Sequence, residues 1–180
     1  MARMGFVIIV SRCIDCRACM VACSVENGVP VGRHRNWVNT VGPTGTFPDL
    51  GMEHIPGNCM HCEHPSCQRV CPTGATYTRP DGIVMIDQDD CIGCGYCIIA
   101  CPYNARFMNE ETGTPDKCTL CVQRIDAGRQ PACVETCIGA SRLYGDFDDP
   151  DSVVPRLLAE NASYRLLTES GNGPQIYYID

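Results

Sequence analysis

The chain has 180 residues and a formal net charge of −7, with a pI near 5.0. This acidity argues against a nucleic-acid partner, which would need clustered basic charge. Without its 16 cysteines the apolar share of 44% falls to about 35%, so something besides a hydrophobic core must stabilise the fold.

The first half of the chain begins with a short apolar segment, residues 5–10, that predicts a strand. It is too short for a membrane span or a secretory signal, so any export would need a partner's signal. Residues 17–27 predict a short helix ended by Gly28. Residues 28–58 are rich in glycine and proline and predict an irregular surface segment, which either docks a partner or only connects.

Asp81-Gly82 separates two short β-prone stretches and predicts a hairpin. Residues 119–127 predict a short helix with Gly128 just beyond its end, and Pro131 opens another helical turn.

The last part of the chain predicts a tail that wraps around or docks on the rest. Residues 143–144 and 176–179 read as strands. Residues 151–159 read as a helix that is interrupted near Pro155.

The sixteen cysteines fall into four groups of four, with none left over. The groups are Cys13, Cys16, Cys19, Cys23; Cys59, Cys62, Cys67, Cys71; Cys91, Cys94, Cys97, Cys101; and Cys118, Cys121, Cys133, Cys137. A secreted disulfide framework is one explanation of so much cysteine. The local spacing opposes it, because residues three apart on one loop cannot each reach a distant partner without strain.

Zinc is the other alternative, since four cysteines also form a closed tetrahedral site. The third group decides against it: Cys91 to Cys101, followed by Pro102, has the C-x2-C-x2-C-x3-C-P spacing of bacterial ferredoxins. In that motif three cysteines hold one 4Fe-4S cluster and the fourth reaches a neighbouring cluster. The fourth group alone would also fit a zinc ribbon, and only the other three groups favour iron and sulfur there.

The spacing also predicts how the groups pair. Groups two and three adjoin and form one ferredoxin-like pair over residues 59–109, which leaves residues 1–58 and 110–145 to contribute the other. The expected fold class is α+β: tandem ferredoxin-like repeats of β-hairpin and short helix, in a pseudo-two-fold arrangement with loop-rich insertions. These repeats occupy residues 1–145, and residues 146–180 form a C-terminal docking tail.

The pattern as a whole resembles a known family, the four-cluster iron-sulfur subunits of molybdopterin oxidoreductases such as polysulfide, thiosulfate and dimethyl sulfoxide reductases. The order of the four spacings carries the likeness, together with the motifs Cys71-Pro-Thr-Gly-Ala, Lys117-Cys118-Thr-Leu-Cys121 and Pro131-Ala-Cys133. The resemblance implies four 4Fe-4S clusters with crossed ligation. The implied ligand sets are Cys13, Cys16, Cys19 with Cys137; Cys59, Cys62, Cys67 with Cys101; Cys91, Cys94, Cys97 with Cys71; and Cys118, Cys121, Cys133 with Cys23.

The resemblance also implies partners and a location. The implied partners are a catalytic subunit with molybdenum or tungsten and usually a membrane-anchor subunit that handles quinol. The implied location is the periplasmic face of the cytoplasmic membrane, with a cytoplasmic relative as the alternative.

The sequence itself shows no nucleophile triad, phosphate loop or paired carboxylates, so no catalytic residue is expected and the chain is not expected to be an enzyme on its own.

The implied function is an electron-transfer subunit of an anaerobic respiratory reductase. The alternatives are a soluble polyferredoxin carrier, or the iron-sulfur component of a formate dehydrogenase or hydrogenase complex. Neither the terminal substrate nor the direction of electron flow can be read from the residues.

Six basic residues lie close in sequence to cysteines and could raise cluster potentials. They are Arg12, Arg17, Arg69, Arg106, Arg124 and Lys117. Lys117 is the strongest candidate, because it is the only lysine and directly precedes Cys118. His61 and His64 are expected to form hydrogen bonds or face a partner rather than replace a thiolate.

Overall fold

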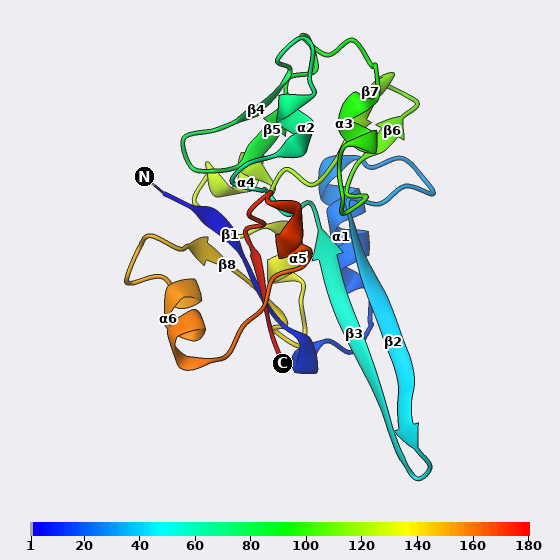
Figure 1. Ribbon diagram of the computed structural model, residues 1–180, viewed down its shortest axis with the longest axis vertical. Helices are drawn as coiled ribbons and strands as arrows, with labels where there is room; N and C mark the ends of the chain where they lie inside the picture. The colour runs from blue at the N-terminus through cyan, green and yellow to red at the C-terminus, as the bar shows by residue number, and fades with distance from the viewer. Residues whose placement is uncertain (1) are drawn as a thin grey trace.

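The computed structural model describes residues 2–180 and shows a mixed α/β chain with small sheets (Figure 1). The strands are β1 (Met4–Ile9), β2 (Asn36–Thr46), β3 (Asp49–Asn58), β4 (Thr76–Thr78), β5 (Val84–Ile86), β6 (Phe107–Asn109), β7 (Thr114–Asp116), β8 (Arg142–Asp146) and β9 (Ile176–Ile179). The helices are α1 (Ala18–Asn27), α2 (Ser66–Arg69), α3 (Tyr96–Ile99), α4 (Val122–Ile125), α5 (Ala132–Glu135) and α6 (Val153–Glu160), with 3-10 turns η1 (Val10–Arg12) and η2 (Thr168–Ser170). Small hairpins beside short helices agree with the predicted class, whereas a pseudo-two-fold relation between halves stays a prediction.

The largest sheet has three strands in the order β8-β1-β9. Strand β1 is antiparallel to β8 and parallel to β9, so that Phe6 lies opposite both Tyr144 and Ile176. The strands predicted at residues 5–10, 143–144 and 176–179 are therefore confirmed. The C-terminal tail returns to pair with the N-terminal strand and docks on the rest of the chain.

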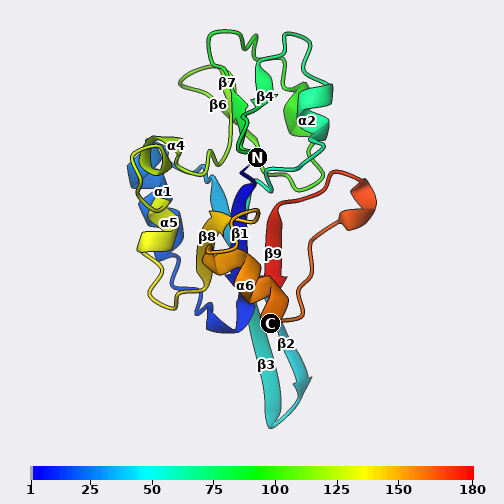
Figure 2. The same ribbon diagram turned by 90° about the vertical axis from the view of Figure 1, so that its left-hand side faces the viewer.

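The two faces of this sheet are covered in different ways. On one face, Val7 and Ile179 form an apolar cluster with Val154 of α6, which lies across the sheet (Figure 2). Phe6 and Ile8 alternate with Val7 and so face the other side. The apolar cluster on that side includes cysteines Cys19, Cys59, Cys118 and Cys133. One face is thus closed by a helix, and the other by the cysteine loops.

Helix α6 is continuous, so the predicted interruption near Pro155 is wrong. Pro155 is the third residue of the helix. A first-turn N–H has no acceptor within its own helix, so proline costs no hydrogen bond there.

Strands β2 and β3 form a long two-stranded arm that projects from the body (Figures 1 and 2). The prediction of an irregular segment at residues 28–58 is therefore wrong from residue 36 onward. Neither face of the outer arm is buried, so no alternating apolar pattern marks the strands. Pro43 lies where the register shifts, and Pro48 lies in the turn, both places where a strand tolerates proline.

The smaller elements mostly follow local sequence signals. Strands β4 and β5 pair around Gly82, which has a φ of 82°, and this confirms the predicted hairpin. Helix α1 ends at Gly28 as predicted. Helix α4 is shorter than the expected 119–127, because Leu120 and Cys121 have left-handed backbones (φ 57° and 53°). Among residues 2–180, no helix combines the length and hydropathy needed to span a bilayer.

Candidate metal centres

None of the sixteen cysteines forms a disulfide, and together they line four separate cavities, here called sites A to D. Site A is lined by Cys71, Cys91, Cys94 and Cys97; site B by Cys59, Cys62, Cys67 and Cys101; site C by Cys23, Cys118, Cys121 and Cys133; and site D by Cys13, Cys16, Cys19 and Cys137. The structure thus brings together the four sets expected from crossed ligation, while their occupation by clusters stays a prediction.

One backbone feature recurs in the four cysteine loops. The residue before the second cysteine always has a left-handed backbone: Asp15 (φ 52°), His61 (φ 43°), Gly93 (φ 68°) and Leu120 (φ 57°). A left-handed residue turns the chain sharply, so the cysteines on either side of it can face one cavity. The x2 spacing therefore has a direct structural explanation.

The short helices explain the crossing of the fourth cysteine. The third cysteine of each group is always the second residue of a helix: Cys19 of α1, Cys67 of α2, Cys97 of α3 and Cys133 of α5. The fourth cysteine follows four residues later. Cys23 is still within α1, whereas Cys71, Cys101 and Cys137 each come directly after the C-cap of the short helix. The helical turn that begins at the third cysteine therefore leads the chain to the fourth, whose thiol lines the neighbouring cavity.

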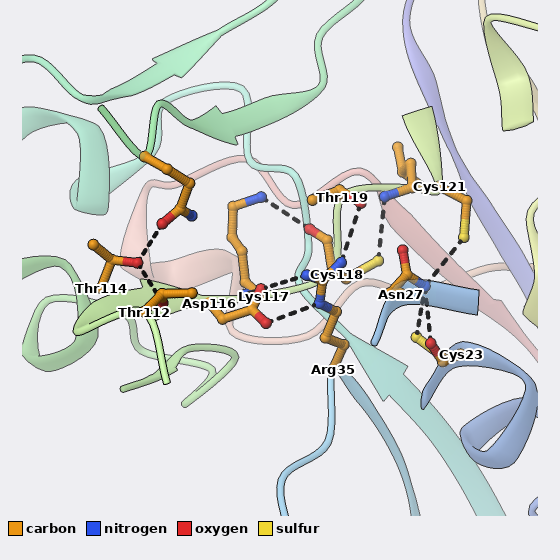
Figure 3. A network of polar contacts seen from close by, with 12 residues as sticks. Cys23, Asn27, Arg35, Thr112, Thr114, Asp116, Lys117, Cys118, Thr119 and Cys121 are labelled. Carbon is orange, nitrogen blue, oxygen red and sulfur yellow. Dashed lines mark hydrogen bonds and ion pairs between the residues drawn. The ribbon is translucent and has the colours of Figure 1, made fainter. Parts of the chain in front are cut away.

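Several sulfur atoms accept hydrogen bonds. Backbone N–H groups donate to Cys71 Sγ from Thr76 (3.4 Å), to Cys118 Sγ from Leu120 (3.4 Å) and to Cys137 Sγ from Ser141 (3.3 Å). Figure 3 shows the side-chain amide of Asn27 between two further sulfurs, 3.6 Å from Cys23 Sγ and 3.7 Å from Cys121 Sγ. Donors of this kind favour the ionised thiolate, which is the form that binds metal.

Burial acts in the opposite direction. Burial, followed by the neighbouring thiols of the same site, raises the pKa of Cys62 and of Cys23 to about 12. Four thiolates in one cavity therefore need a positive core to stay ionised. An iron core supplies that charge, and four sulfur donors around a cavity fit a 4Fe-4S cluster.

A single metal ion fits the geometry less well. Among residues 2–180, no three Cys, His, Asp or Glu side chains converge closely enough to hold one ion. The thiols are instead spread around the walls of four cavities, four thiols to each. This arrangement favours a polynuclear centre at each site over the zinc alternative.

The four sites form a row, because each of the pairs A and B, B and C, and C and D has groups close enough to act on one another. Burial and then nearby thiols raise the pKa of Cys118 of site C, and Cys59 of site B is one of these thiols. Burial also raises the pKa of Cys133 of site C, to about 11, with Cys19 of site D contributing. Arg106 lies near Cys67 of site B and Cys97 of site A. The order of the sites is therefore A, B, C, D.

Two of the basic residues singled out in the sequence lie among the sites. Lys117 is buried, and its ammonium donates to the backbone carbonyls of Val84 and Cys118. Arg106 is also buried and donates to Cys67 Sγ at 2.9 Å.

The other four candidates are exposed or paired with carboxylates, although Arg12 and Arg17 also line site D. Arg124 is buried but forms ion pairs with Glu26 and Glu135, and exposed Arg17 pairs with Asp15. Arg69 donates to Ser66 Oγ and, like Arg12, is exposed.

Sequence reasoning missed Arg142 and Asn58. Arg142 is fully buried, lines site D and donates to Asn58 Oδ1 at 2.8 Å. Asn58 in turn lines site C and donates to Cys118 Sγ at 3.8 Å. The two residues are 84 positions apart, and no local signal in the sequence links them.

His61 has the expected hydrogen-bonding role. Its Nδ1 accepts the N–H of Val84 at 3.1 Å. Burial, together with the charges of Lys117 and Arg106, lowers the pKa of His61 well below its usual value, so the ring is neutral. His64 is exposed, and its backbone N–H donates to the carbonyl of Asn172.

Comparison with protein families agrees with this geometry. Residues 50–147 match one family model described as a 4Fe-4S dicluster domain, and residues 12–75 match a second model of the same description. The chain belongs to the 4Fe-4S dicluster family. Two dicluster domains and sixteen cysteines fit four 4Fe-4S clusters.

Curated relatives of this dicluster protein are components of larger complexes. It is 44% identical to the putative iron-sulfur subunit of a dimethyl sulfoxide reductase from Halobacterium salinarum, covering 100% of this chain and 80% of the relative. It is 44% identical to a subunit of the tetrathionate reductase of Salmonella typhimurium (98% and 72% covered) and 40% identical to a subunit of the sulfite dehydrogenase of Allochromatium vinosum (99% and 83%). These relatives agree with the expectation of an electron-transfer subunit rather than a catalytic one.

Proposed function

We propose that this chain is the electron-transfer subunit of a molybdopterin-dependent respiratory reductase, and that it relays single electrons through four 4Fe-4S clusters in sites A to D. The observation that supports this most is the lining of each cavity by one complete set of four cysteines. A bound 4Fe-4S cluster takes up and returns one electron at a time.

The protein's own contribution is to hold, space and insulate these centres. We assign the four cysteines of each site as its cluster ligands. Eight of the sixteen cysteines are buried, and the sites with the most buried thiols are B and C. Exclusion of water there protects the inner centres and keeps their hydrogen-bond partners fixed.

The ends of the row differ from its middle. Only Cys94 of site A and Cys16 of site D are exposed cysteines among residues 2–180. Isoleucines beside the ligands of these two sites, Ile92 and Ile14, are also exposed, by 66% and 61%. Sites A and D are therefore the points at which electrons enter and leave, and where partner subunits would approach.

The proposed partners are a molybdenum- or tungsten-containing catalytic subunit and a membrane subunit that exchanges electrons with quinone. Relatives named as subunits of dimethyl sulfoxide, tetrathionate and selenate reductases support the first. The family resemblance supports the second, and with it a location at the periplasmic face of the cytoplasmic membrane.

The first test is cluster content. Protein purified without oxygen should contain about 16 iron and about 16 labile sulfide atoms per chain, in four clusters. Colourless protein without iron would contradict the proposal.

Changing Cys97→Ala should alter the site A cluster alone, giving a 3Fe-4S species or an empty site, because it removes one iron-facing thiol. EPR spectroscopy would show one changed signal and three unchanged ones. Ile99→Ala is the matched control: it lies on the same helix α3, is 85% exposed, and should leave all four signals intact. Four unaltered signals in the Cys97 variant would show that this cysteine is not a ligand.

The partner test separates the remaining alternatives. Anaerobic purification of the tagged chain from its own cells should retain a much larger chain that contains molybdenum or tungsten. A soluble monomer would favour the polyferredoxin carrier, and a partner with formate dehydrogenase or hydrogenase activity would favour that type of complex.

A further inference from the structure

One buried cation lies at each of the three junctions in the row of sites. The first is Arg106, between sites A and B. Its guanidinium donates to Cys67 Sγ of site B at 2.9 Å and to Thr76 Oγ1 at 3.3 Å. Thr76 lines site A, and its N–H donates to Cys71 Sγ of that site. Arg106 thus reaches the walls of both cavities at once.

Lys117 occupies the second junction, between sites B and C. Its ammonium donates to the carbonyl of Cys118, a site C cysteine, at 2.9 Å (Figure 3). The same ammonium donates to the carbonyl of Val84, which lines site B. The side chain is 1% exposed.

Arg142 occupies the third junction, between sites C and D. It lines site D, and through Asn58 it is linked to Cys118 Sγ of site C. Its Nε is buried and has no partner among the described residues. This donor lacks the counter-group that burial ordinarily requires.

The three cations differ from buried Arg124 and half-buried Arg35. Arg124 pairs with two glutamates, and Arg35 pairs with Asp116 at 2.8 Å. Within residues 2–180, Arg106, Lys117 and Arg142 form no ion pair with a carboxylate. A buried cation without a carboxylate is unstable unless another anion lies close by. The thiolate-bound clusters of the two flanking sites are such anions, at about −2 each when oxidised.

We propose that Arg106, Lys117 and Arg142 each act electrostatically on the two clusters beside them, and that each stabilises the reduced state of both. This inference rests on the proposed function. A reduced cluster gains a negative charge, and two neighbouring reduced clusters repel each other. A fixed cation between them offsets that repulsion and raises both potentials. Electrons can then occupy adjacent centres together.

The test uses the full chain with its clusters, and three neutral variants. Arg106→Gln should lower the midpoint potentials of clusters A and B, Lys117→Met those of B and C, and Arg142→Gln those of C and D. In each variant the other two potentials should not move. EPR-monitored redox titration measures all four, and cysteine variants at each site assign the signals.

Two kinds of control separate charge from structure. Arg124→Gln removes a buried arginine that lines none of the four cavities, so all four potentials should stay as in the unaltered chain. Lys117→Arg and Arg142→Lys keep the charge and should restore the potentials lost in the neutral variants. A purely structural role would not give this paired pattern.

The outcomes are distinguishable. If the unaltered chain holds four clusters and a neutral variant keeps them without a shift in the flanking pair, or with equal shifts in all four, the inference is wrong and the proposed function stands. If the unaltered chain holds no clusters, the proposed function fails and the inference fails with it. If one neutral variant does not retain its clusters, the other two junctions decide, because each makes the same prediction about a different pair.

Discussion

Gly93 differs from the other residues at its position in the cysteine loops. Asp15, His61 and Leu120 carry side chains there with left-handed backbones. At Gly93 a Cβ would lie only 2.5 Å from the carbonyl oxygen of Gly113. This site alone therefore needs glycine for space as well as for conformation.

Gly93→Ala should selectively disrupt site A. The collision with the Gly113 backbone adds to the ordinary cost of a left-handed alanine, about 1–2 kcal/mol. Iron content should fall from about 16 to about 12 atoms per chain, with the site A signal lost. The control is Gly128→Ala, which has a similar φ of 73° and open space around the Cβ, and it should keep all its iron. Equal iron loss in both variants would show that the backbone angle, rather than the collision, is what matters.

At the scale of residues, the sequence predicts ligands better than their surroundings. The spacing of the cysteines reflects local loops and one turn of helix, so the four ligand sets can be predicted from the sequence. Arg142 follows Cys137 by five residues, as Arg106 follows Cys101, but its link to site C runs through Asn58, which is 84 positions away. Lys117 could be singled out because it is the only lysine and directly precedes Cys118.

At the scale of elements, the β2–β3 arm shows where local signals fail. Helix α1 and strand β1 follow from amphipathic or apolar patterns that burial imposes. The outer arm is exposed on both faces, so its residues are not patterned, and its glycines and prolines resemble those of a loop. Phe47, Leu50 and Met52 near its tip are exposed by 84%, 54% and 58%.

Shortening the arm should leave the isolated chain intact. Thr40 and His54 are paired across the strands, so residues 41–53 can be replaced by an Asn-Gly turn. All thirteen removed residues are exposed, so we expect unchanged iron content and a Tm within about 2 °C of the original. Trp37→Ala, at the base of the arm and packed on the main apolar cluster, is the contrasting variant and should cost on the order of 2 kcal/mol. Loss of iron on shortening would mean that the outer arm supports the sites.

At the scale of the whole molecule, the fold has two kinds of core. Eight of the 26 buried apolar residues among those described are cysteines. The region around α2 and α3 has only a small buried cluster, Cys67, Val84 and Cys97. The sheet and α6 instead share an apolar cluster without cysteine. Metal binding therefore stabilises one part of the molecule far more than the other.

Removal of iron by a chelator should unfold these parts unequally. Hydrogen exchange of the apoprotein should become fast in α2, α3, β4 and β5, which depend on the cysteine sites. Strands β1, β8 and β9 should keep partial protection, because Val7, Phe147, Val154 and Ile179 still pack together. Uniform loss or uniform retention of protection over the whole chain would contradict this division.

The exposure of Cys94 and Cys16 at the two ends of the row makes these two sites the most sensitive to oxygen. Oxygen and peroxide attack accessible iron-sulfur centres first, so damage would begin at the terminals and spread inward. In the proposed function, sites A and D are also the points at which electrons enter and leave the chain. A partner protein that covers either end would therefore both exchange electrons with the cluster there and protect that cluster from oxidative damage.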